Sequence, residues 1–296
     1  MRKFFQLLIW YLFTAFKIFV LLWHNILPAK NRFFRYFIIK AENYIFFSPR
    51  VYKVSYIRKE VKNSMEQVRL FTKDMVRIHA SYMPAEEGKP TVIFFHGQSE
   101  NITKWQDTWL FLKKLGYGAF FLSYRGHYKS AGRPSEKGIY IDAETAVEYL
   151  LKKGLKEKDI ILWGRSLGSA AALQTALKYN VRSVIIESGI LDIKTAAESV
   201  FKRYIKIFHI HIIKDFIMWL IQSSVFLQRF DNKEKISKIK VPVLIIHAKN
   251  DEKIDFEQAV KLHEQNPQTK LILEEDGSHD KTDWAFPHIE EFLKEN

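Results

Sequence analysis

The sequence contains no cysteine. Disulfide bonds, thiolate catalysis and cysteine–zinc sites are therefore excluded. The histidines and acidic residues show no metal-ligand spacing, so we expect neither a metal nor another cofactor. There is also no internal repeat, no low-complexity tract and no long Gly/Ser linker. What remains is a chain of 296 residues, 47% of them apolar, which suffices for one large α/β domain with an appendage.

The net charge of +13 is unevenly distributed along the chain. Residues 1–89 hold 16 lysines and arginines against 6 acidic residues, whereas the remainder holds 30 against 27. Positive charge beside an apolar stretch favours anionic lipid headgroups as the partner. Nucleic-acid binding is disfavoured, because the rest of the chain is near charge balance and has no stacking platform or recognition helix.

The N-terminal stretch 4–27 is almost continuously apolar, with Lys17 as its one charged residue. It is long enough to span a bilayer as a helix, and we expect residues 1–27 to form a single-pass membrane anchor. An in-plane amphipathic helix and a signal peptide are the alternatives. More positive residues follow the stretch than precede it, which favours a cytoplasmic catalytic domain. Residues 28–65 form a basic, aromatic connector that lies on the membrane surface or packs on that domain.

From residue 66 to 296, short apolar runs alternate with helical patterns. This alternation predicts a mostly parallel, doubly wound α/β sheet, the architecture of the α/β-hydrolase fold. The expected strands are 67–71, 76–83, 91–95, 118–122, 160–163, 184–186, 243–247 and 270–273. The expected helices are 104–115, 142–152, 169–179 and 283–294.

One insert, at about 190–239, interrupts the alternation with a helical and strongly aromatic pattern. It precedes a strand, so it would lie above the carboxyl ends of the strands, where ligands bind in such folds. As an apolar lid it would favour acyl chains or other lipid-like groups. A helix pair packed on the sheet is the alternative of equal weight.

The sequence Gly164-Arg165-Ser166-Leu167-Gly168 fits the G-x-S-x-G pattern, with a predicted strand before it and a helix after it. In this context the serine stands on a sharp turn, clear of the sheet, and the small flanking residues avoid a clash between strand and helix. The helix N-terminus favours developing negative charge. We therefore predict Ser166 as a nucleophile, against the alternative of a structural serine in a tight turn.

A serine hydroxyl needs a base, which this fold supplies late in the chain, after an acid. His279 follows the last predicted strand, and Asp251 follows the strand before it. Adjacent strand ends can bring both residues over Ser166, where the acid would orient the imidazole. Asp192 is the best alternative acid, and we expect His247 to be a satisfied core residue.

An oxyanion hole needs two N–H donors. We assign one to the backbone of Leu167, which follows the nucleophile, and the other to the backbone of Gln98. Gln98 lies in the loop after the strand 91–95, where Gly97 permits an unusual backbone conformation.

Taken together, these segments resemble the α/β-hydrolase superfamily, in particular the abhydrolase-domain-containing membrane serine hydrolases and their bacterial relatives. The resemblance covers roughly residues 66–290. Its pieces are HGQSEN (96–101), SYRGHYKSAGRPSEKGIYIDAETAVEYL (123–150), GRSLGS (164–169), PVLIIHAKNDEKI (242–254) and DGSHD (276–280). The resemblance implies an N-terminal apolar anchor, cleavage of carboxylic esters or acyl thioesters, often of lipids, and the same roles for Ser166, Asp251 and His279.

Three departures from the family pattern stand near the predicted site. Gln98 and Glu100 replace the usual Asn and Gly. Ser169 replaces a second glycine that usually follows the nucleophile elbow, the turn that carries Ser166. Residues 123–128 differ from the usual Asp-Tyr-Arg-Gly-Tyr-Gly-like run. The backbone of Gln98 can still serve the oxyanion hole. Glu100 places a carboxylate near the expected entrance, which would disfavour anionic substrates.

The expected function is therefore a serine hydrolase of lipid-like carboxylic esters or thioesters that works through an acyl-enzyme. A serine peptidase on the same fold would need acidic residues for the substrate's terminal amine, and Glu100 and Glu187 are the obvious candidates. A non-catalytic membrane scaffold is the third possibility, which a missing triad residue would favour. The sequence carries no signal for an oligomeric state.

Overall fold

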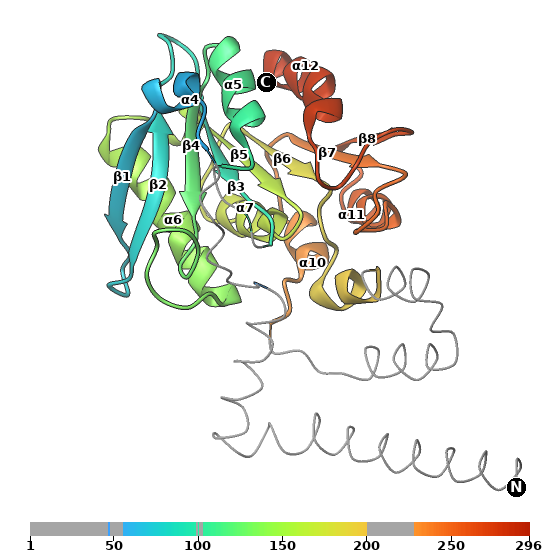
Figure 1. Cartoon of the computed structure of the whole chain (residues 1–296). Coiled ribbons are helices and arrows are strands. Elements are labelled where there is room, and N and C mark those ends of the chain that lie inside the picture. The colour runs from blue at the N-terminus through green and yellow to red at the C-terminus, as the bar shows by residue number, and fades with distance from the viewer. Residues whose placement is uncertain (1–46, 48–55, 99, 101–102, 200–227) are drawn as a thin grey trace, which may run out of the picture.

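The computed structural model describes Phe47 and residues 56–98, 100, 103–199 and 228–296. Figure 1 shows the chain and the elements built from these residues. The sheet has eight strands. They are β1 Glu66–Phe71, β2 Arg77–Met83, β3 Thr91–Phe95, β4 Gly118–Ser123, β5 Ile160–Arg165, β6 Ser183–Glu187, β7 Val243–Ala248 and β8 Lys270–Glu274.

The strands lie in the order β1-β2-β4-β3-β5-β6-β7-β8. β1 pairs antiparallel with β2 and β2 antiparallel with β4, whereas all later neighbours are parallel. Phe95, Gly164 and Ile186 are successive cross-strand partners. The loops after β3, β5 and β6 therefore leave the sheet at the same edge, and the loops after β7 and β8 do so as well. This edge is called the carboxyl edge below.

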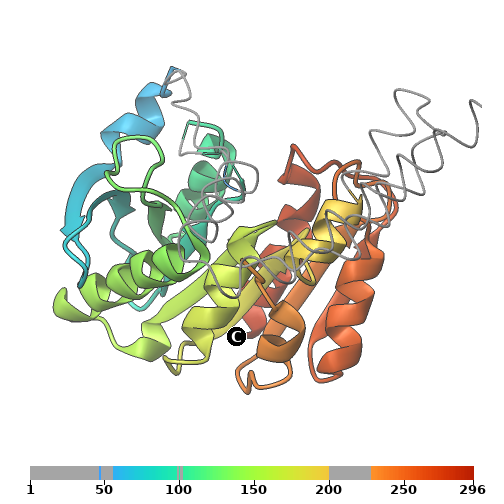
Figure 2. The same ribbon diagram turned by 90° about the horizontal axis from the view of Figure 1, so that it is seen from below.

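Helices cover both faces of the sheet, as parallel strands require. The α-helices are α4 Lys59–Asn63, α5 Gln106–Lys114, α6 Glu136–Lys152, α7 Gly168–Ala176, α10 Asn232–Ile236, α11 Glu257–Gln265 and α12 Phe286–Glu295. Two 3₁₀ turns, η1 Glu157–Asp159 and η2 Asp283–Ala285, are also present, and residues 193–199 are helical. Figure 2 shows α6, α7, α10 and α11 on one face, and α5 and α12 on the other.

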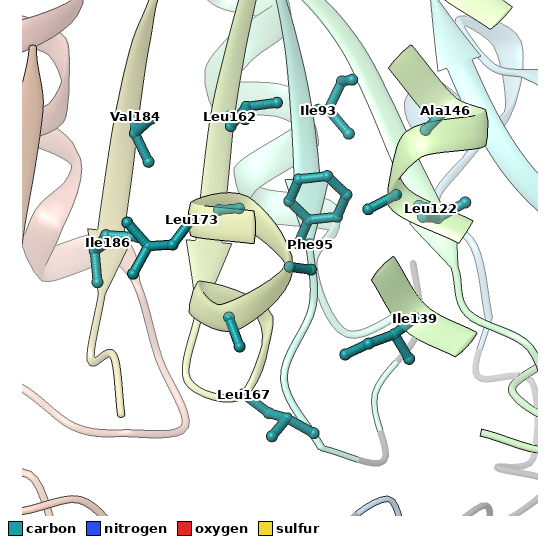
Figure 3. Packing of buried hydrophobic residues seen from close by; sticks show 14 of the residues in the cluster. Ile93, Phe95, Leu122, Ile139, Ala146, Leu162, Leu167, Leu173, Val184 and Ile186 are labelled. Carbon is teal, nitrogen blue, oxygen red and sulfur yellow. The ribbon is translucent and has the colours of Figure 1, made fainter. Parts of the chain in front are cut away.

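The hydrophobic core is divided by the sheet into two layers. On the α6/α7 side, Ile93, Phe95 and Leu162 of the central strands pack against Leu173 and Ala146 (Figure 3). All five side chains are completely buried, and burying a side chain of the Leu, Ile or Phe type stabilises a fold by about 1.5–3 kcal/mol. These layers give the strand ends a rigid support for the loops of the carboxyl edge.

A second layer fills the α5/α12 side. Trp109 of α5, Trp163 of β5, Phe94 of β3 and Ile289 of α12 are buried in one cluster. The rings of Phe94 and Trp163 meet edge to face, with centroids 5.5 Å apart. The apolar runs that predicted buried strands thus contribute residues to both layers, which explains why these runs do not alternate with polar residues.

The predicted α/β-hydrolase fold is confirmed by this sheet, and each predicted strand is present to within two residues at either end. The helix predicted at 142–152 begins six residues earlier, at Glu136. Its N-cap is Ser135, whose Oγ accepts a hydrogen bond from the N–H of Gly138 at 3.1 Å. Serine before glutamate is a helix-start signal that the apolar periodicity alone does not reveal.

The predicted membrane anchor 1–27 and most of the connector 28–65 lie outside the described residues, as do residues 200–227 of the predicted lid insert. Among the residues that the structure describes, no helix combines the length and apolarity needed to cross a bilayer. Two described parts of the connector pack on the sheet domain. Phe47 is buried with its ring centroid 5.7 Å from that of Phe230, and Val61 of α4 lies in the α5/α12 core layer.

Candidate active site

The predicted nucleophile stands on a strained turn between β5 and α7. Ser166 has φ = 51°, in the left-handed region, and its N–H donates to the carbonyl of Glu187 at 2.9 Å. The turn brings α7 so close to β3 that a Cβ at Gly168 would lie 2.0 Å from the carbonyl oxygen of Phe95. Only glycine fits there, and a non-glycine residue held at positive φ is typical of a functional site.

Ser169, at the position of the family's second glycine, is a buried hydrogen-bonding residue. Its Oγ donates to the carbonyl of Ser166 at 2.6 Å and accepts from the Nδ2 of Asn232 at 3.1 Å and the N–H of Ile190 at 3.3 Å. This hydroxyl therefore ties the elbow to the chain after β6 and to α10. The departure from the family pattern adds a link and leaves the turn intact.

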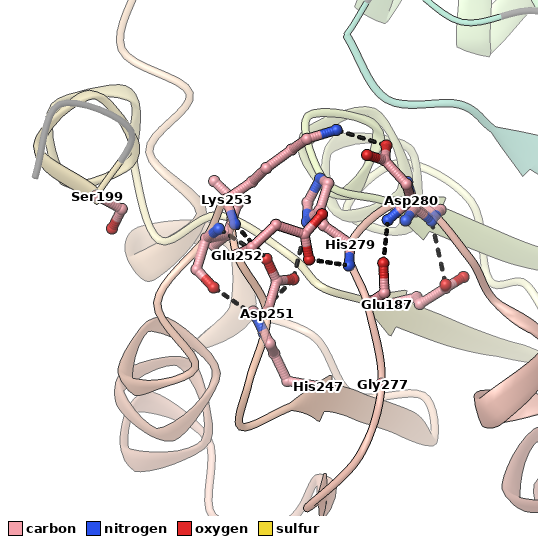
Figure 4. A network of polar contacts seen from close by, with 12 residues as sticks. Glu187, Ser199, His247, Asp251, Glu252, Lys253, Gly277, His279 and Asp280 are labelled. Atoms are coloured by element: carbon pink, nitrogen blue, oxygen red, sulfur yellow. Dashed lines mark hydrogen bonds and ion pairs between the residues drawn. The ribbon is translucent and has the colours of Figure 1, made fainter. Parts of the chain in front are cut away.

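Asp251 and His279 form a hydrogen-bonded pair at the carboxyl edge, beyond β7 and β8 (Figure 4). Asp251 Oδ2 lies 2.8 Å from His279 Nδ1. The other carboxylate oxygen, Oδ1, accepts the backbone N–H groups of Lys253 at 2.8 Å and Ile254 at 2.9 Å. An ionised carboxylate can only accept hydrogen bonds, so Nδ1 of His279 carries the proton and donates to Asp251 Oδ2. In the neutral imidazole this leaves Nε2 as the proton acceptor.

The acid has a second histidine neighbour. His247 is completely buried, and its Nε2 lies 3.3 Å from Asp251 Oδ2 and 3.1 Å from the carbonyl oxygen of Ile254. Both partners are acceptors, so Nε2 carries the proton. Burial raises the pKa of Asp251, but hydrogen bonds from His247 and His279 outweigh burial and hold the pKa well below its usual range.

His279 is 5% exposed, and its backbone N–H donates to Glu252 Oε2 at 3.0 Å. Burial lowers its pKa more than the hydrogen bond to Asp251 raises it, and the nearby charge of Arg165 lowers it further. The imidazole is therefore neutral at pH 7, as a general base must be. No hydrogen bond joins Ser166 Oγ to His279 among the described residues, and such contacts often form only with substrate bound.

The loop after β3 lies against the elbow. A Cβ at Gly97 would come within 3.2 Å of Ser166 Cβ, so the backbone next to Gln98 approaches the predicted nucleophile as an oxyanion loop must. The N–H of Leu167, just before α7, donates no hydrogen bond to any described residue. Of the two predicted donors, Leu167 directly follows Ser166, and Gln98 follows Gly97, which approaches Ser166.

Glu100 holds this loop in place. Its Oε2 accepts the N–H of Gly97 at 2.9 Å and the indole N–H of Trp105 at 3.1 Å. Its Oε1 lies 2.8 Å from Lys104 Nζ and 3.5 Å from Arg165 Nη1. Burial raises the pKa of Glu100, but the charges of Arg165 and Lys104 outweigh burial and lower it overall. The carboxylate of Glu100 is therefore ionised, largely enclosed and paired with two cations, and it supports the loop.

Arg165 and Glu187 form a second buried pair directly beneath the elbow. Both side chains are completely buried, and Arg165 Nε lies 3.1 Å from Glu187 Oε1. Glu187 Oε2 accepts the indole N–H of Trp163 at 2.9 Å, and the guanidinium lies 4.2 Å from the ring centroid of Trp105. Both candidate acids for a substrate amine, Glu100 and Glu187, are therefore engaged by the protein itself.

Asp192, the alternative acid, is used locally. Its Oδ1 accepts the N–H of Thr195 at 2.7 Å, and residues 193–199 are helical. Asp192 thus caps a helix start, and it is Asp251 that is bonded to His279. In the described part of the chain, no group of three or more histidines and acidic residues is arranged to hold a metal ion.

Comparison with known proteins finds a family model and curated relatives that are similar to this sequence. The family model described as "Serine aminopeptidase, S33" matches residues 86–223. Protein bem46 of Schizosaccharomyces pombe is 31% identical over 212 residues, which are 69% of this chain and 66% of that protein. Alpha/beta hydrolase domain-containing protein 17B of Xenopus laevis is 29% identical over 197 residues, which are 65% of this chain and 61% of that protein.

Solved structures share the fold. An esterase from Pyrococcus furiosus superposes with a TM-score of 0.62 at 22% identity, over 81% of this chain and 94% of the esterase. An esterase from Exiguobacterium antarcticum gives a TM-score of 0.59 at 21% identity, over 77% of this chain and 100% of that esterase. The chain belongs to the α/β-hydrolase superfamily. The fold and these relatives support a hydrolase.

Three contacts of this α/β-hydrolase were missed by sequence reasoning. Neither the contact of His247 with Asp251 nor the pairs of Arg165 with Glu100 and Glu187 was expected. Arg165 lies inside the G-x-S-x-G motif, and an arginine in a strand that is otherwise wholly apolar was a usable signal. A fully buried arginine requires acidic partners, because an unpaired buried charge is costly.

Proposed function

We propose that this protein is a serine hydrolase of carboxylic esters or thioesters with lipid-like acyl groups. The observation that carries the proposal is the Asp251–His279 pair, 2.8 Å apart, at the same sheet edge as the left-handed Ser166. A strained serine, a neutral imidazole and an orienting carboxylate are the parts needed for nucleophilic acyl transfer.

In this mechanism His279 Nε2 takes the proton of Ser166 Oγ as the oxygen attacks the substrate carbonyl. The backbone N–H groups of Leu167 and Gln98 stabilise the resulting oxyanion. Collapse of the tetrahedral intermediate expels the alcohol or thiol, which takes its proton from His279 and leaves an acyl-enzyme on Ser166. A water molecule then attacks the acyl-enzyme in the same way, giving its proton to His279. Collapse of this second intermediate returns the proton to Ser166 and releases the carboxylic acid product. Asp251 stabilises the imidazolium in both half-reactions.

Apolar side chains near the elbow support an acyl substrate. Leu167, which follows the predicted nucleophile, belongs to one buried cluster with Phe47, Tyr124, Ile190 and Phe230. Each of them follows a strand at the carboxyl edge or belongs to a segment that packs there. Such surroundings favour hydrocarbon chains over charged groups.

A peptidase that binds a terminal amine is less well supported. The acids that would hold an ammonium group, Glu100 and Glu187, already pair with Arg165, and Glu100 also pairs with Lys104. A substrate amine would have to displace the completely buried Arg165 from both acids, and Lys104 from Glu100 as well. The proposal also includes the N-terminal segment 1–27 as a single-pass anchor that leaves the catalytic domain in the cytoplasm, where the enzyme would act on membrane lipids.

The test is labelling with a fluorophosphonate probe together with hydrolysis of p-nitrophenyl esters of increasing chain length. Wild-type protein should label and cleave, and Ser166→Ala should do neither. Ser188→Ala is the matched control, because Ser188 is also buried at a strand end with a left-handed φ of 46°. Folded wild-type protein that neither labels nor cleaves would contradict the proposal. Faster release from aminoacyl anilides than from esters would favour the peptidase.

A further inference from the structure

The tip of the β1–β2 hairpin is a rigid turn that presents apolar side chains to solvent. The N–H of Met75 donates to the carbonyl of Thr72 at 2.8 Å, and the Oγ1 of Thr72 accepts the N–H of Val76 at 2.9 Å. Met75 has φ = 61° and is 78% exposed, and Phe71 is 64% exposed. A left-handed methionine costs about 1–2 kcal/mol relative to glycine, so local stability does not explain its presence.

Three cations surround these apolar groups. Phe71 pairs across the hairpin with Arg77, and Arg69 pairs with His79. Lys129 lies in the neighbouring loop, which is joined to β2 where the N–H of His79 donates to Ser130 Oγ at 2.8 Å. Partial burial lowers the pKa of His79, and the charges of Lys129, Arg77 and Arg69 lower it further. The three cations therefore lie close enough to His79 to concentrate positive charge around it.

Within the described part of the chain these three cations have no anionic partner, whereas Lys73 and Asp74 of the turn are both in ion pairs. Among the described residues, Arg69, Arg77 and Lys129 form no ion pair, and Lys129 lies 5.1 Å from the ring centroid of Tyr128. The one carboxylate of the turn, Asp74, is paired with Arg125 at 2.7 Å. The hairpin patch, defined as Arg69, Phe71, Met75, Arg77 and Lys129, thus joins exposed apolar groups with unpaired positive charge.

The hairpin patch lies at the edge of the sheet that carries the candidate site. Because β2 runs antiparallel to β4, the start of β2 is at the end of β4, where His79 pairs with Ser123. The tip therefore extends from the carboxyl edge, the lower side of the sheet in Figure 1. Strand spacing puts β1 and β2 roughly 15–20 Å from β5, which carries Ser166 at its end.

We propose that the hairpin patch docks on an anionic lipid bilayer and turns the carboxyl edge of the sheet toward the membrane surface. Exposed Phe71 and Met75 enter the headgroup–acyl boundary, and Arg69, Arg77 and Lys129 bind lipid phosphates and carboxylates. This contact is additional to the predicted N-terminal anchor. An anchor of that kind tethers the domain without orienting it, whereas a contact at the carboxyl edge fixes which side faces the lipid.

The absence of native cysteine allows a direct test in the full-length protein. Met75→Cys is labelled with an environment-sensitive nitrobenzoxadiazole dye, and the protein is reconstituted in nanodiscs of phosphatidylcholine with or without phosphatidylserine. The matched control is Glu87→Cys, an exposed position in the β2–β3 connection at the opposite edge of the sheet. The dye at residue 75 should shift to shorter wavelength and brighten in phosphatidylserine discs, and the dye at residue 87 should not.

A charge variant and a salt series sharpen the result. Arg69→Gln and Arg77→Gln should each lower the ratio of docked to undocked protein about fivefold, whereas the corresponding Arg→Lys variants should keep it. High salt should act like the Gln variants. Equal dye responses at residues 75 and 87 would overturn the proposal. So would a response at residue 75 that is the same with and without phosphatidylserine. Either result is also what a patch that binds a protein partner, and not lipid, would give.

The membrane contact rests on a different measurement from the proposed hydrolase activity, so the experiment distinguishes the failure of one proposal from the failure of the other. Met75→Cys combined with Ser166→Ala should dock as well as Met75→Cys alone. If the Met75→Cys protein with Ser166 intact gives the dye response but no fluorophosphonate labelling, only the hydrolase proposal is contradicted. An intact labelling reaction without a dye response would contradict only the membrane contact.

Discussion

Glu100 accepts the backbone N–H of Gly97 at 2.9 Å, so a partly buried carboxylate supports the loop that approaches Ser166. The same carboxylate pairs with Arg165, the residue before Ser166, at 3.5 Å. One side chain thus connects the predicted oxyanion loop with the elbow. This relationship makes Glu100 a positioning residue whose contribution can be separated from general stability.

Replacement of Glu100 should affect both turnover and the pH profile. Glu100→Gln keeps an oxygen acceptor for Gly97 but removes a charge that raises the pKa of His279. We expect a modest loss of kcat and an acidic limb of kcat/KM at lower pH than in wild type. Glu100→Ala also removes the acceptor and should lower kcat about tenfold further. An unchanged acidic limb in Glu100→Gln would contradict the electrostatic part.

Asp251→Asn should abolish most of the activity without unfolding the protein. An amide can donate where the carboxylate accepts, which favours the wrong imidazole tautomer at His279, and we expect kcat to fall about a thousandfold or more. His247→Gln is the matched control, because glutamine keeps an N–H donor for Asp251, and its loss should be much smaller. Equal losses in the two variants, measured with p-nitrophenyl esters, would show that Asp251 has no special role.

His96 should make the fold sensitive to acid. Burial lowers its pKa from 6.5 to about 4, and the nearby His127 adds to the lowering. A lowered pKa means that the unfolded chain binds the proton more tightly, so the stabilisation is complete above pH 6.5 and is lost as the pH falls toward 4. This one group should remove about 3 kcal/mol from the free energy of unfolding over that range.

Urea denaturation at pH 7 and pH 5 measures the effect of His96. His96→Asn removes the titrating group, so its free energy of unfolding should change less between the two pH values than that of wild type. Identical changes in the two proteins would show that His96 is not the group responsible. Groups such as Asp251, whose pKa is held far below the usual range, lower the free energy of unfolding only at still lower pH.

Gly168→Ala should prevent the elbow from forming. The added Cβ would lie 2.0 Å from a backbone oxygen of β3, and backbone cannot move aside as a side chain can. We expect a loss of about 3 kcal/mol or more in stability, together with loss of fluorophosphonate labelling. Gly88→Ala is the control, because Gly88 has φ = 76° but open space around it, and should cost about 1 kcal/mol.

The sequence by itself determined the fold class, most strand positions and the pairing of Asp251 with His279. These follow from local signals: continuous apolar runs mark strands buried on both faces, and the order of serine, acid and histidine follows strand ends along one edge. The start of α6 at Glu136 depended on a cap at Ser135, a signal that apolar periodicity does not contain.

Only the tertiary structure decided which charges meet. Glu100 and Arg165 are 65 residues apart, and Arg165 and Glu187 are 22 apart, so no local pattern reveals that they neutralise each other. Likewise, the hairpin patch lies at the same edge of the sheet as the candidate site only because β2 pairs antiparallel with β4 and returns its start to the carboxyl edge. The physical reason is that burial and the local dielectric, which decide what a charge does, are set by packing between segments distant in the chain.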